Sequence, residues 1–200
     1  MYRARTALLP TTALLVPLKS FNSAKERLGE ALSPDDRSAL MRSLAAGVLA
    51  SCGNMSAWVV CEDPDVASFA LDHRAQVIWR TGGLNPVVTQ AFLFLRFSGF
   101  RRVVVAHGDL ADPTDLRLFN HEQMADPASV LIASDRHRDG TNVLSVPTDA
   151  DFAFAYGPGS FANHWVEAKR CNLAVAEANA PSLALDVDTP DDLVLYRELR

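Results

Sequence analysis

Residues 13–36 read ALLVPLKSFNSAKERLGEALSPDD and contain the two local signals on which the fold prediction rests. The run at 13–18 is continuously apolar, which is typical of a strand that is buried on both faces. Ser33 and Pro34, followed by two aspartates, are typical of the first turn of a helix. The stretch therefore predicts a buried strand followed by a helix, the repeating unit of an α/β protein.

The same alternation continues along most of the chain. Apolar runs at 57–61, 76–79, 103–106 and 130–133 predict further strands, and Asn85-Pro86 and Thr189-Pro190 predict helix starts. Strands and helices that alternate at this spacing form a mostly parallel sheet flanked by helices. We therefore expect a Rossmann-like α/β fold.

The last third of the chain departs from this rhythm. Runs at 142–146 and 152–156 predict a small antiparallel ribbon, followed by a helix over 161–178 and a strand over 183–187. Because the chain has neither repeats nor a linker, we expect one domain over residues 13–200 and a loose tail over residues 1–12. The tail begins like a signal peptide, but Pro10, Thr11 and Thr12 interrupt its apolar stretch.

Composition excludes some classes of function. The chain has 200 residues, of which 48% are hydrophobic and 22% charged, as in globular proteins. Its net charge of −5 argues against a general binder of nucleic acid or of an anionic membrane surface. Three cysteines without C-x-x-C spacing favour a reducing compartment. No apolar run reaches the roughly 18 residues of a membrane span, so we expect a cytoplasmic protein.

Charge is unevenly distributed along the sequence. Residues 1–42 carry seven Lys or Arg against four Asp or Glu, whereas residues 181–200 carry two against five. Lys19, Lys25 and Arg27 follow the first predicted strand, and ligands of an open α/β sheet bind beyond the carboxyl ends of its strands. Three cations at such an edge suit a triphosphate, although a solvated helix face is the ordinary alternative.

Three carboxylates also follow predicted strands. Asp109 comes after the run at 103–106, and Asp186 and Asp188 are two positions apart, which directs both to one side of an extended chain. Together they predict a magnesium site beside substrate phosphates. Taken singly, Asp188 would be explained as a cap of the following helix and Asp109 as a turn residue.

Glycine-containing loops at 139–142 and 156–161 suggest an anion site. Gly157 and Ser160 precede a predicted helix, where backbone N–H groups hold anions, and the hydroxyls of Thr141 and Ser160 are further donors. Such loops are also common as purely structural turns. Gly83 and Asn85 form another loop, which suits either a base or ribose contact or a helix N-cap. No serine, cysteine and histidine pattern indicates a nucleophilic triad.

Six segments together resemble a known family. VPLKSFNSAKERL, GLN, the aspartate after the fourth strand, DGTNVL, FAYGPGSFANH and LDVDTPDDL occur in the order found in the CofC family, over residues 13–195. The resemblance implies a GT-A-like nucleotidyltransferase that joins GMP from GTP to a phosphorylated three-carbon acid and releases pyrophosphate, in coenzyme F-420 biosynthesis. The acceptor in this family is 2-phospho-L-lactate, phosphoenolpyruvate or 3-phosphoglycerate.

The resemblance also implies roles for the candidate residues. Magnesium would be held by Asp109, Asp186 and Asp188; the acceptor by Thr141, Gly157 and Ser160; and the GTP phosphates by Lys19, Lys25 and Arg27. Of these, we expect Asp109, Lys25 and Lys19 to be catalytic. Gly83 and Asn85 are further substrate-contact candidates, and Asp63 is a candidate acceptor for guanine N–H groups. The sequence departs from the family at Ala111, where proline is usual, and Arg136-His137-Arg138 adds positive charge beside the expected acceptor site.

Two other functions remain open at this point. A GT-A-like nucleotidyltransferase for a sugar phosphate or the molybdenum cofactor would carry a glycine-rich loop after the first strand, which this sequence lacks. A catalytically silent nucleotide-binding subunit is the other alternative. The expected partners are GTP and the acceptor acid, with no nucleic acid or membrane; transfer of the product to a downstream enzyme and the oligomeric state are left open.

Overall fold

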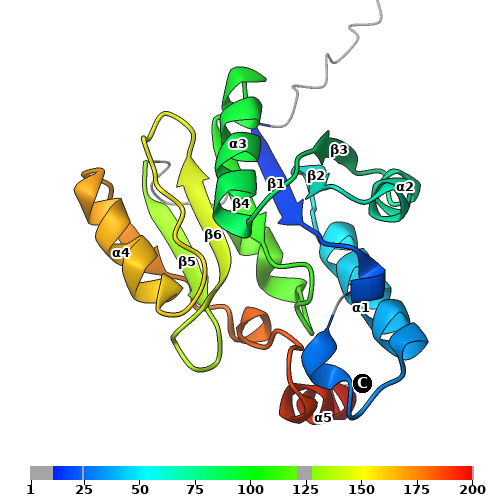
Figure 1. Cartoon of the computed structure of the whole chain (residues 1–200). Coiled ribbons are helices and arrows are strands. Elements are labelled where there is room, and N and C mark those ends of the chain that lie inside the picture. The colour runs from blue at the N-terminus through cyan, green and yellow to red at the C-terminus, as the bar shows by residue number, and fades with distance from the viewer. Residues whose placement is uncertain (1–10, 24, 121–127, 200) are drawn as a thin grey trace, which may run out of the picture.

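A seven-stranded sheet forms the centre of the molecule (Figure 1). The computed structural model describes residues 11–23, 25–120 and 128–199. The strands are β1 (Thr12–Pro17), β2 (Ser56–Cys61), β3 (Gln76–Trp79), β4 (Arg102–Ala106), β5 (Val130–Ser134), β6 (Thr141–Pro147) and β7 (Val175–Glu177). The helices are α1 (Pro34–Ala50), α2 (Pro64–Asp72), α3 (Leu84–Phe97), α4 (Ser160–Arg170) and α5 (Pro190–Glu198). Short 3-10 turns are η1 (Phe21–Ser23), η2 (Glu26–Leu28), η3 (Thr114–Phe119) and η5 (Pro181–Ala184).

The strand order is β3-β2-β1-β4-β6-β5-β7. Strands β3, β2, β1 and β4 are parallel to one another, and β7 is parallel to β5. Strand β6 runs antiparallel to both of its neighbours, β4 and β5. The expected α/β fold with a mostly parallel sheet is therefore confirmed. The carboxyl ends of β1 to β4 open at the same edge.

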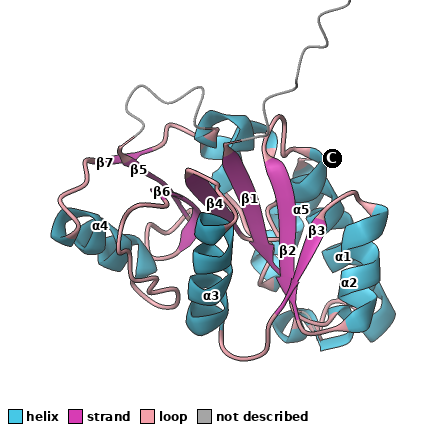
Figure 2. Ribbon diagram, turned by 90° about the horizontal axis from the view of Figure 1, so that it is seen from above, coloured by secondary structure: helices cyan, strands magenta, loops and turns pink. Residues whose placement is uncertain are grey.

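Helices cover both faces of the sheet, which is why its central strands are largely apolar (Figure 2). Successive residues of β1 alternate between the two faces: Leu14 and Val16 pack with buried residues of α1 and α2, whereas Ala13 and Leu15 pack with those of α3. The two core layers hold the strands in a fixed register and leave the strand ends free for polar residues.

The expected helix starts at Ser33 and Thr189 are confirmed. The Ser33 side chain accepts a hydrogen bond from the Asp36 N–H, and Thr189 forms a reciprocal capping box with Asp192 at the start of α5. Helix α3 begins one residue earlier than the sequence suggested, with Gly83 as its N-cap.

The predicted ribbon is wrong in one of its two strands. Residues 152–156 adopt no regular secondary structure, and β6 pairs instead with β4 and β5 inside the main sheet. The segment is held by side chains: Asn85 accepts a hydrogen bond from Tyr156 N–H at 2.7 Å, and His164 Nε2 accepts one from Ala155 N–H at 3.0 Å. An apolar run held in this way has the sequence pattern of a strand without its backbone pairing.

The C-terminal boundaries also differ from the prediction. Helix α4 ends at Arg170, because Asn172 has a left-handed conformation (φ 55°) and the Leu173 N–H bonds back to the Ala168 carbonyl. The following residues then form β7, an edge strand. The predicted strand at 183–187 is absent: η5 occupies its first part, and only Asp186 makes an isolated bridge, to Leu110.

Only the end of the expected N-terminal tail lies within the described residues. Strand β1 begins at Thr12, so the last residue of the expected tail belongs to the sheet, and residues 1–10 lie outside the described residues. Among the helices that the structure describes, none has the length and apolar character required to cross a membrane.

Candidate active site

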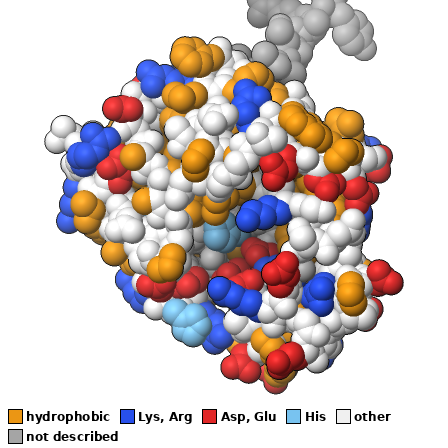
Figure 3. Space-filling model, viewed as in Figure 1, with side chains coloured by type: hydrophobic (Ala, Val, Ile, Leu, Met, Phe, Trp, Pro, Cys, Tyr) orange, Lys and Arg blue, Asp and Glu red, His pale blue; other side chains and the backbone are white. Residues whose placement is uncertain are grey.

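A cavity of about 320 Å³ lies beyond the carboxyl ends of β1 to β4. Its walls include residues that follow each of these four strands, the start of α3, and Asp188. Figure 3 shows a hollow on this face, with a histidine inside it and acidic and basic side chains around it. The cavity therefore lies where an open α/β sheet binds its ligands.

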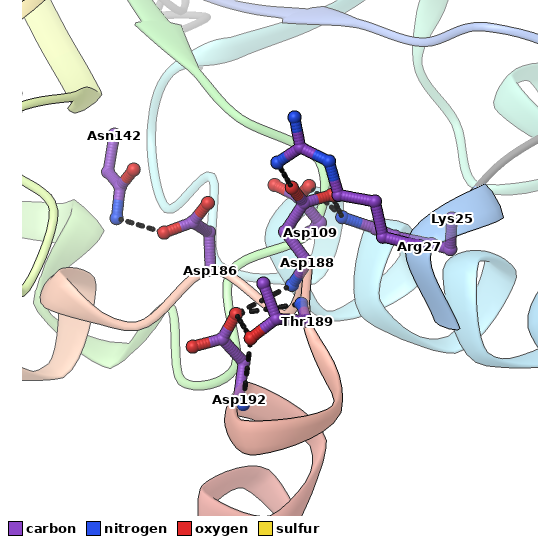
Figure 4. Close-up of polar contacts among 8 residues, drawn as sticks. All are labelled: Lys25, Arg27, Asp109, Asn142, Asp186, Asp188, Thr189 and Asp192. Carbon is purple, nitrogen blue, oxygen red and sulfur yellow. Dashed lines mark hydrogen bonds and ion pairs between the residues drawn. The ribbon is translucent and has the colours of Figure 1, made fainter. Parts of the chain in front are cut away.

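Basic and acidic residues from opposite ends of the chain meet at this cavity (Figure 4). The ammonium group of Lys25 forms an ion pair with Asp109 Oδ2 and lies 3.6 Å from Asp188 Oδ1. Arg27 Nη1 donates to Asp188 Oδ2 at 2.7 Å. The Lys25 side chain is only 5% exposed, whereas that of Arg27 is 75% exposed. Lys19 also lines the cavity and is exposed to solvent.

The protein environment keeps Asp109 ionised. Burial acts to raise the pKa of its carboxyl, but the electrostatic interactions with Lys25 and His107, together with the Lys25 hydrogen bond, outweigh burial and lower the pKa. Asp186 behaves in the opposite way: burial and the negative charge of Asp109 raise its pKa. The two carboxyls thus repel each other in the absence of a shared cation.

His107, Asp109 and Asp186 each offer a ligand atom, and these atoms lie within 4.8 Å of one another. His107 Nε2 and Asp109 Oδ1 are buried and have no hydrogen-bond partner among the described residues. Unpaired buried polar atoms of this kind are costly without a ligand. An imidazole and two carboxylates are suitable ligands for a divalent cation. The residues present therefore fit a metal ion at this position.

Backbone pairing holds Asp109 next to the C-terminal acidic pair. The Val187 N–H donates to the Asp109 carbonyl at 3.0 Å, and the Ala111 N–H donates to the Leu185 carbonyl at 2.9 Å. Gly108 permits the close approach of this loop to β1, because a Cβ at position 108 would lie 2.3 Å from Leu18 Cδ2. The loop after β4 and residues 185–187 therefore run side by side.

Asp188 is not used to cap α5. Thr189 and Asp192 supply that cap, and the Asp188 backbone N–H donates to Asp192 Oδ2 at 3.2 Å. The Asp188 carboxylate is thus directed to Lys25 and Arg27. Asp186 points the other way, where its Oδ1 accepts a hydrogen bond from Asn142 Nδ2 at 3.3 Å (Figure 4).

The predicted acceptor residues lie together but away from the cavity lining. Thr141 Oγ1 hydrogen-bonds His164 Nδ1 at 3.0 Å, and both residues are fully buried. Ser160 is 2% exposed, whereas Gly157 is exposed and has a positive φ of 123°. Asp139 joins the two glycine loops, because its Oδ1 accepts a hydrogen bond from the Gly159 N–H.

The remaining candidates are engaged in structural hydrogen bonds or helix caps. Gly83 is the N-cap of α3, and Asn85 bonds to the backbone of Tyr156. Asp63 caps α2, with its Oδ1 accepting from the N–H groups of Asp65 and Val66. A hydrogen bond from Ser20 is the main cause of its lowered pKa. None of the three candidates belongs to the described cavity lining, which contains Glu62 instead of Asp63.

Several residues of the cavity, among them His107, Glu62 and Arg80, are not predicted from the sequence. His107 is not among the predicted site residues, although its position two residues before Asp109 is a usable signal for a shared site. Glu62 directly follows β2 and lines the cavity, but it was not considered beside its neighbour Asp63.

A family model described as "Guanylyl transferase CofC like" matches residues 12–196. The chain belongs to the CofC-like guanylyltransferase family. The family resemblance drawn from the sequence is thereby confirmed, as is the expectation of a nucleotidyltransferase enzyme. Alternative assignments to a sugar-phosphate or molybdenum-cofactor nucleotidyltransferase do not match this family.

Relatives of this CofC-like protein are named for two acceptors. Phosphoenolpyruvate guanylyltransferase of Conexibacter woesei is 36% identical, covering 94% of this chain and 88% of the relative. The 2-phospho-L-lactate guanylyltransferase of Methanothermobacter thermautotrophicus is 29% identical, covering 91% and 82%.

The fold is also similar to that of solved structures. One is a Desulfovibrio desulfuricans protein described as a nucleotide-diphospho-sugar transferase, with a TM-score of 0.77, 20% identity, and 96% and 88% of the two chains covered. Its similarity agrees with the GT-A-like fold expected for the CofC-like family.

Proposed function

We propose that this protein transfers GMP from GTP to a small phosphorylated three-carbon acid and releases pyrophosphate. Family membership supports guanylyl transfer, and one structural observation carries the proposal: Lys25 and Arg27 lie beside Asp109 and Asp188 at the strand ends. This arrangement combines groups that neutralise phosphates with groups that hold a metal ion.

The reaction needs little covalent chemistry from the protein. A phosphate oxygen of the acceptor forms a bond to the α-phosphorus of GTP, while the bond from that phosphorus to the oxygen bridging to the β-phosphorus breaks. The electron pair of the broken bond leaves with pyrophosphate. The attacking oxygen is already ionised at neutral pH, so no general base is required. The protein must instead align two anions and neutralise their charge.

The cations of the site supply this neutralisation. In the proposal, Lys19 and Arg27 contact the triphosphate from the open side, and Lys25 acts from the buried side. A point charge at the end of a flexible lysine and the planar fork of an arginine both suit phosphate oxygens.

We further propose that Mg²⁺ binds to Asp109, Asp186 and Asp188, with His107 as an additional ligand. The unpaired Asp109 Oδ1 and His107 Nε2 support this assignment. When bound, the ion would neutralise phosphate charge that develops during transfer. The carboxylates would hold the ion, and the Asn142 amide keeps Asp186 in position.

The acceptor is assigned to the glycine loops. The exposed Gly157, three residues before α4, offers a backbone approach for a phosphate or carboxylate, and the buried Thr141 and Ser160 are the other proposed contacts. Gly83 and Asn85 remain proposed substrate contacts. The named acceptors of the relatives, phosphoenolpyruvate and 2-phospho-L-lactate, are both candidates, together with 3-phosphoglycerate. In the proposal, the product is a precursor in coenzyme F-420 biosynthesis and the enzyme acts in the cytoplasm. Residues 13–200 form its catalytic domain.

An acceptor panel tests the proposal. Purified protein is incubated with GTP, Mg²⁺ and each of the three acids, and the products are identified by mass spectrometry alongside a pyrophosphate assay. We expect a GMP–acid phosphodiester with at least one acceptor, and none with the Asp109→Asn variant. Absence of the product with all three acids would overturn the proposal.

A further inference from the structure

The cavity extends across four strand ends, and its two ends differ in chemistry. In the order β3-β2-β1-β4, the charged cluster follows β1 and β4, while Glu62 and Arg80 follow β2 and β3. Because neighbouring strands are about 4.8 Å apart, the ends of β4 and β2 are separated by about 10 Å. Phosphates bound at the charged cluster would therefore direct the rest of the nucleotide toward β2 and β3.

This second end of the cavity has the character of a base-binding site. Val60, Leu84 and Val87 provide apolar surface, against which a planar ring can pack. Glu62 and Arg80 follow the paired residues Cys61 and Trp79, and so lie just beyond the ends of two adjacent strands.

Only one of the two carboxylate oxygens of Glu62 accepts a hydrogen bond from the described residues. Its Oε2 accepts a hydrogen bond from the Gly82 N–H at 3.3 Å, whereas its Oε1 makes no hydrogen bond within the described parts of the chain. Gly82 has a φ of 125°, which favours glycine at this position. Asp63, by contrast, has its Oδ1 engaged by two N–H groups of α2. Of these two adjacent acids, only Glu62 is available inside the cavity.

A carboxylate distinguishes guanine from the other bases. Guanine presents two neighbouring donors, N1–H and the 2-amino group, to which the two oxygens of a carboxylate can bind together. Adenine has an unprotonated N1 at the same edge and lacks the 2-amino group, so it would oppose the carboxylate with a lone pair. A site built for two donors disfavours an analogue that leaves its polar groups unpaired.

We propose that Glu62 binds the N1–H and 2-amino groups of guanine and thereby sets the preference for GTP. This inference rests on the proposed function in one respect: it takes GTP as the nucleotide bound at this cavity. It deepens that function by assigning the specificity of the base to one side chain, at the opposite end of the cavity from the reacting phosphates.

Direct binding of nucleotides tests the proposal. Calorimetry would measure the dissociation constants of GTP, ITP and ATP for the wild-type protein, for Glu62→Gln and for Glu198→Gln. Glu198 is an exposed glutamate at the end of α5, outside the cavity lining, so its variant controls for the loss of one negative charge. Both substituted positions are exposed, and matching melting temperatures establish that the variants are folded.

The three nucleotides give distinct expectations. Wild-type protein should bind GTP about tenfold or more tightly than ITP, which lacks the 2-amino group, and more tightly still than ATP. In Glu62→Gln the amide NH₂ opposes one guanine donor, so GTP should lose about tenfold or more in affinity and its advantage over ITP should vanish. Glu198→Gln should behave as wild type.

Two outcomes overturn the proposal: a Glu62→Gln variant that keeps the wild-type ratio of GTP to ITP affinity, or a wild-type protein that does not prefer GTP. Neither outcome depends on catalysis. A Glu62-dependent preference for GTP without GMP transfer would support this inference and count against the proposed function. Transfer of GMP with unchanged base preference in Glu62→Gln would do the reverse.

Discussion

Lys25 forms an ion pair with Asp109, a residue 84 positions later in the chain, and its ammonium group also lies 3.6 Å from Asp188. This nearly buried cation thus stands between two carboxylates that we assign to a metal ion. The uneven charge distribution of the sequence is explained by this contact, because the basic segment after β1 lies against the acidic C-terminal segment.

Removal of the Lys25 charge should impair both folding and catalysis. In Lys25→Met, Asp109 keeps its charge in a largely buried position without its partner, which costs about 3 kcal/mol in comparable sites. We expect a lower melting temperature in EDTA, partly restored by Mg²⁺, and a loss of GMP transfer of about a hundredfold or more. Thermal unfolding with and without Mg²⁺ checks the first effect. A variant as stable as wild type in EDTA would contradict it.

Asp188 and Thr189 should separate catalysis from stability. Asp188 is a proposed metal ligand, so Asp188→Asn should abolish GMP transfer. Because Thr189 and Asp192 cap α5, the same change should alter the melting temperature little. Thr189→Ala removes the cap and should lower the free energy of unfolding by about 1 kcal/mol while retaining activity. Urea unfolding and product assays on both variants provide the comparison. A large loss of stability in Asp188→Asn would instead favour a structural role for its carboxylate.

The metal site can be tested without turnover. Asp186 has a raised pKa, so its ionised form is disfavoured in the folded state and opposes folding at neutral pH. Asp186→Asn should therefore raise the melting temperature in EDTA and remove the stabilisation by Mg²⁺. The hydrogen bond from Asn142 Nδ2 should survive this substitution, because the side-chain oxygen of an asparagine can also accept it. The variant therefore tests the charge at position 186 and not the loss of that bond.

His107 is the second test of that site. If its Nε2 is a ligand, His107→Leu should weaken binding of Mn²⁺ by about tenfold or more, as measured by electron paramagnetic resonance of the free ion. Unchanged Mn²⁺ affinity would remove the histidine from the ligand set. Because His107→Leu leaves the carboxylates in place, residual binding is expected.

Stability should decline in mild acid because of His164. Burial is the main cause that lowers the pKa of this histidine to about 4, below the ordinary value of about 6.5 that it regains on unfolding. The unfolded state therefore binds an additional proton between these pH values, and stability is lost as pH falls through this range, by about 1.4 kcal/mol per unit. Urea unfolding at pH 7, 6 and 5 measures the slope, which should be smaller in His164→Gln.

Much of the fold follows from local signals. Buried strands such as 103–106 are apolar on both faces, and the caps at Ser33 and Thr189 are formed by the residues that the sequence indicates. The segment at 152–156 is wrongly predicted as a strand, because its order comes from side-chain contacts with His164 and with Asn85, which is 71 positions from Tyr156. Long-range side-chain contacts of this kind leave no periodic signal.

The site was predictable to the extent that strand ends share one edge. That rule accounts for the proximity of Lys25 and Arg27 to Asp109. Asp188 follows no strand, and backbone bonds between residues 185–187 and the loop after β4 bring it to the same place. The rule does not tell which of two adjacent acids faces a cavity: the N–H groups of α2 engage Asp63, and Glu62 is left to line the wall. Nor does it show that the Thr141 hydroxyl is buried against His164.

The Asn85 side-chain amide makes two hydrogen bonds to the backbone of Tyr156: its oxygen accepts from the N–H at 2.7 Å, and its nitrogen donates to the carbonyl at 3.0 Å. It thereby connects the first turn of α3, beside the cavity, to the segment at 152–156 that leads into the glycine loop. In the proposed reaction this side chain acts as a spacer of fixed length between two substrates. Its replacement would alter their separation rather than the chemistry at either one.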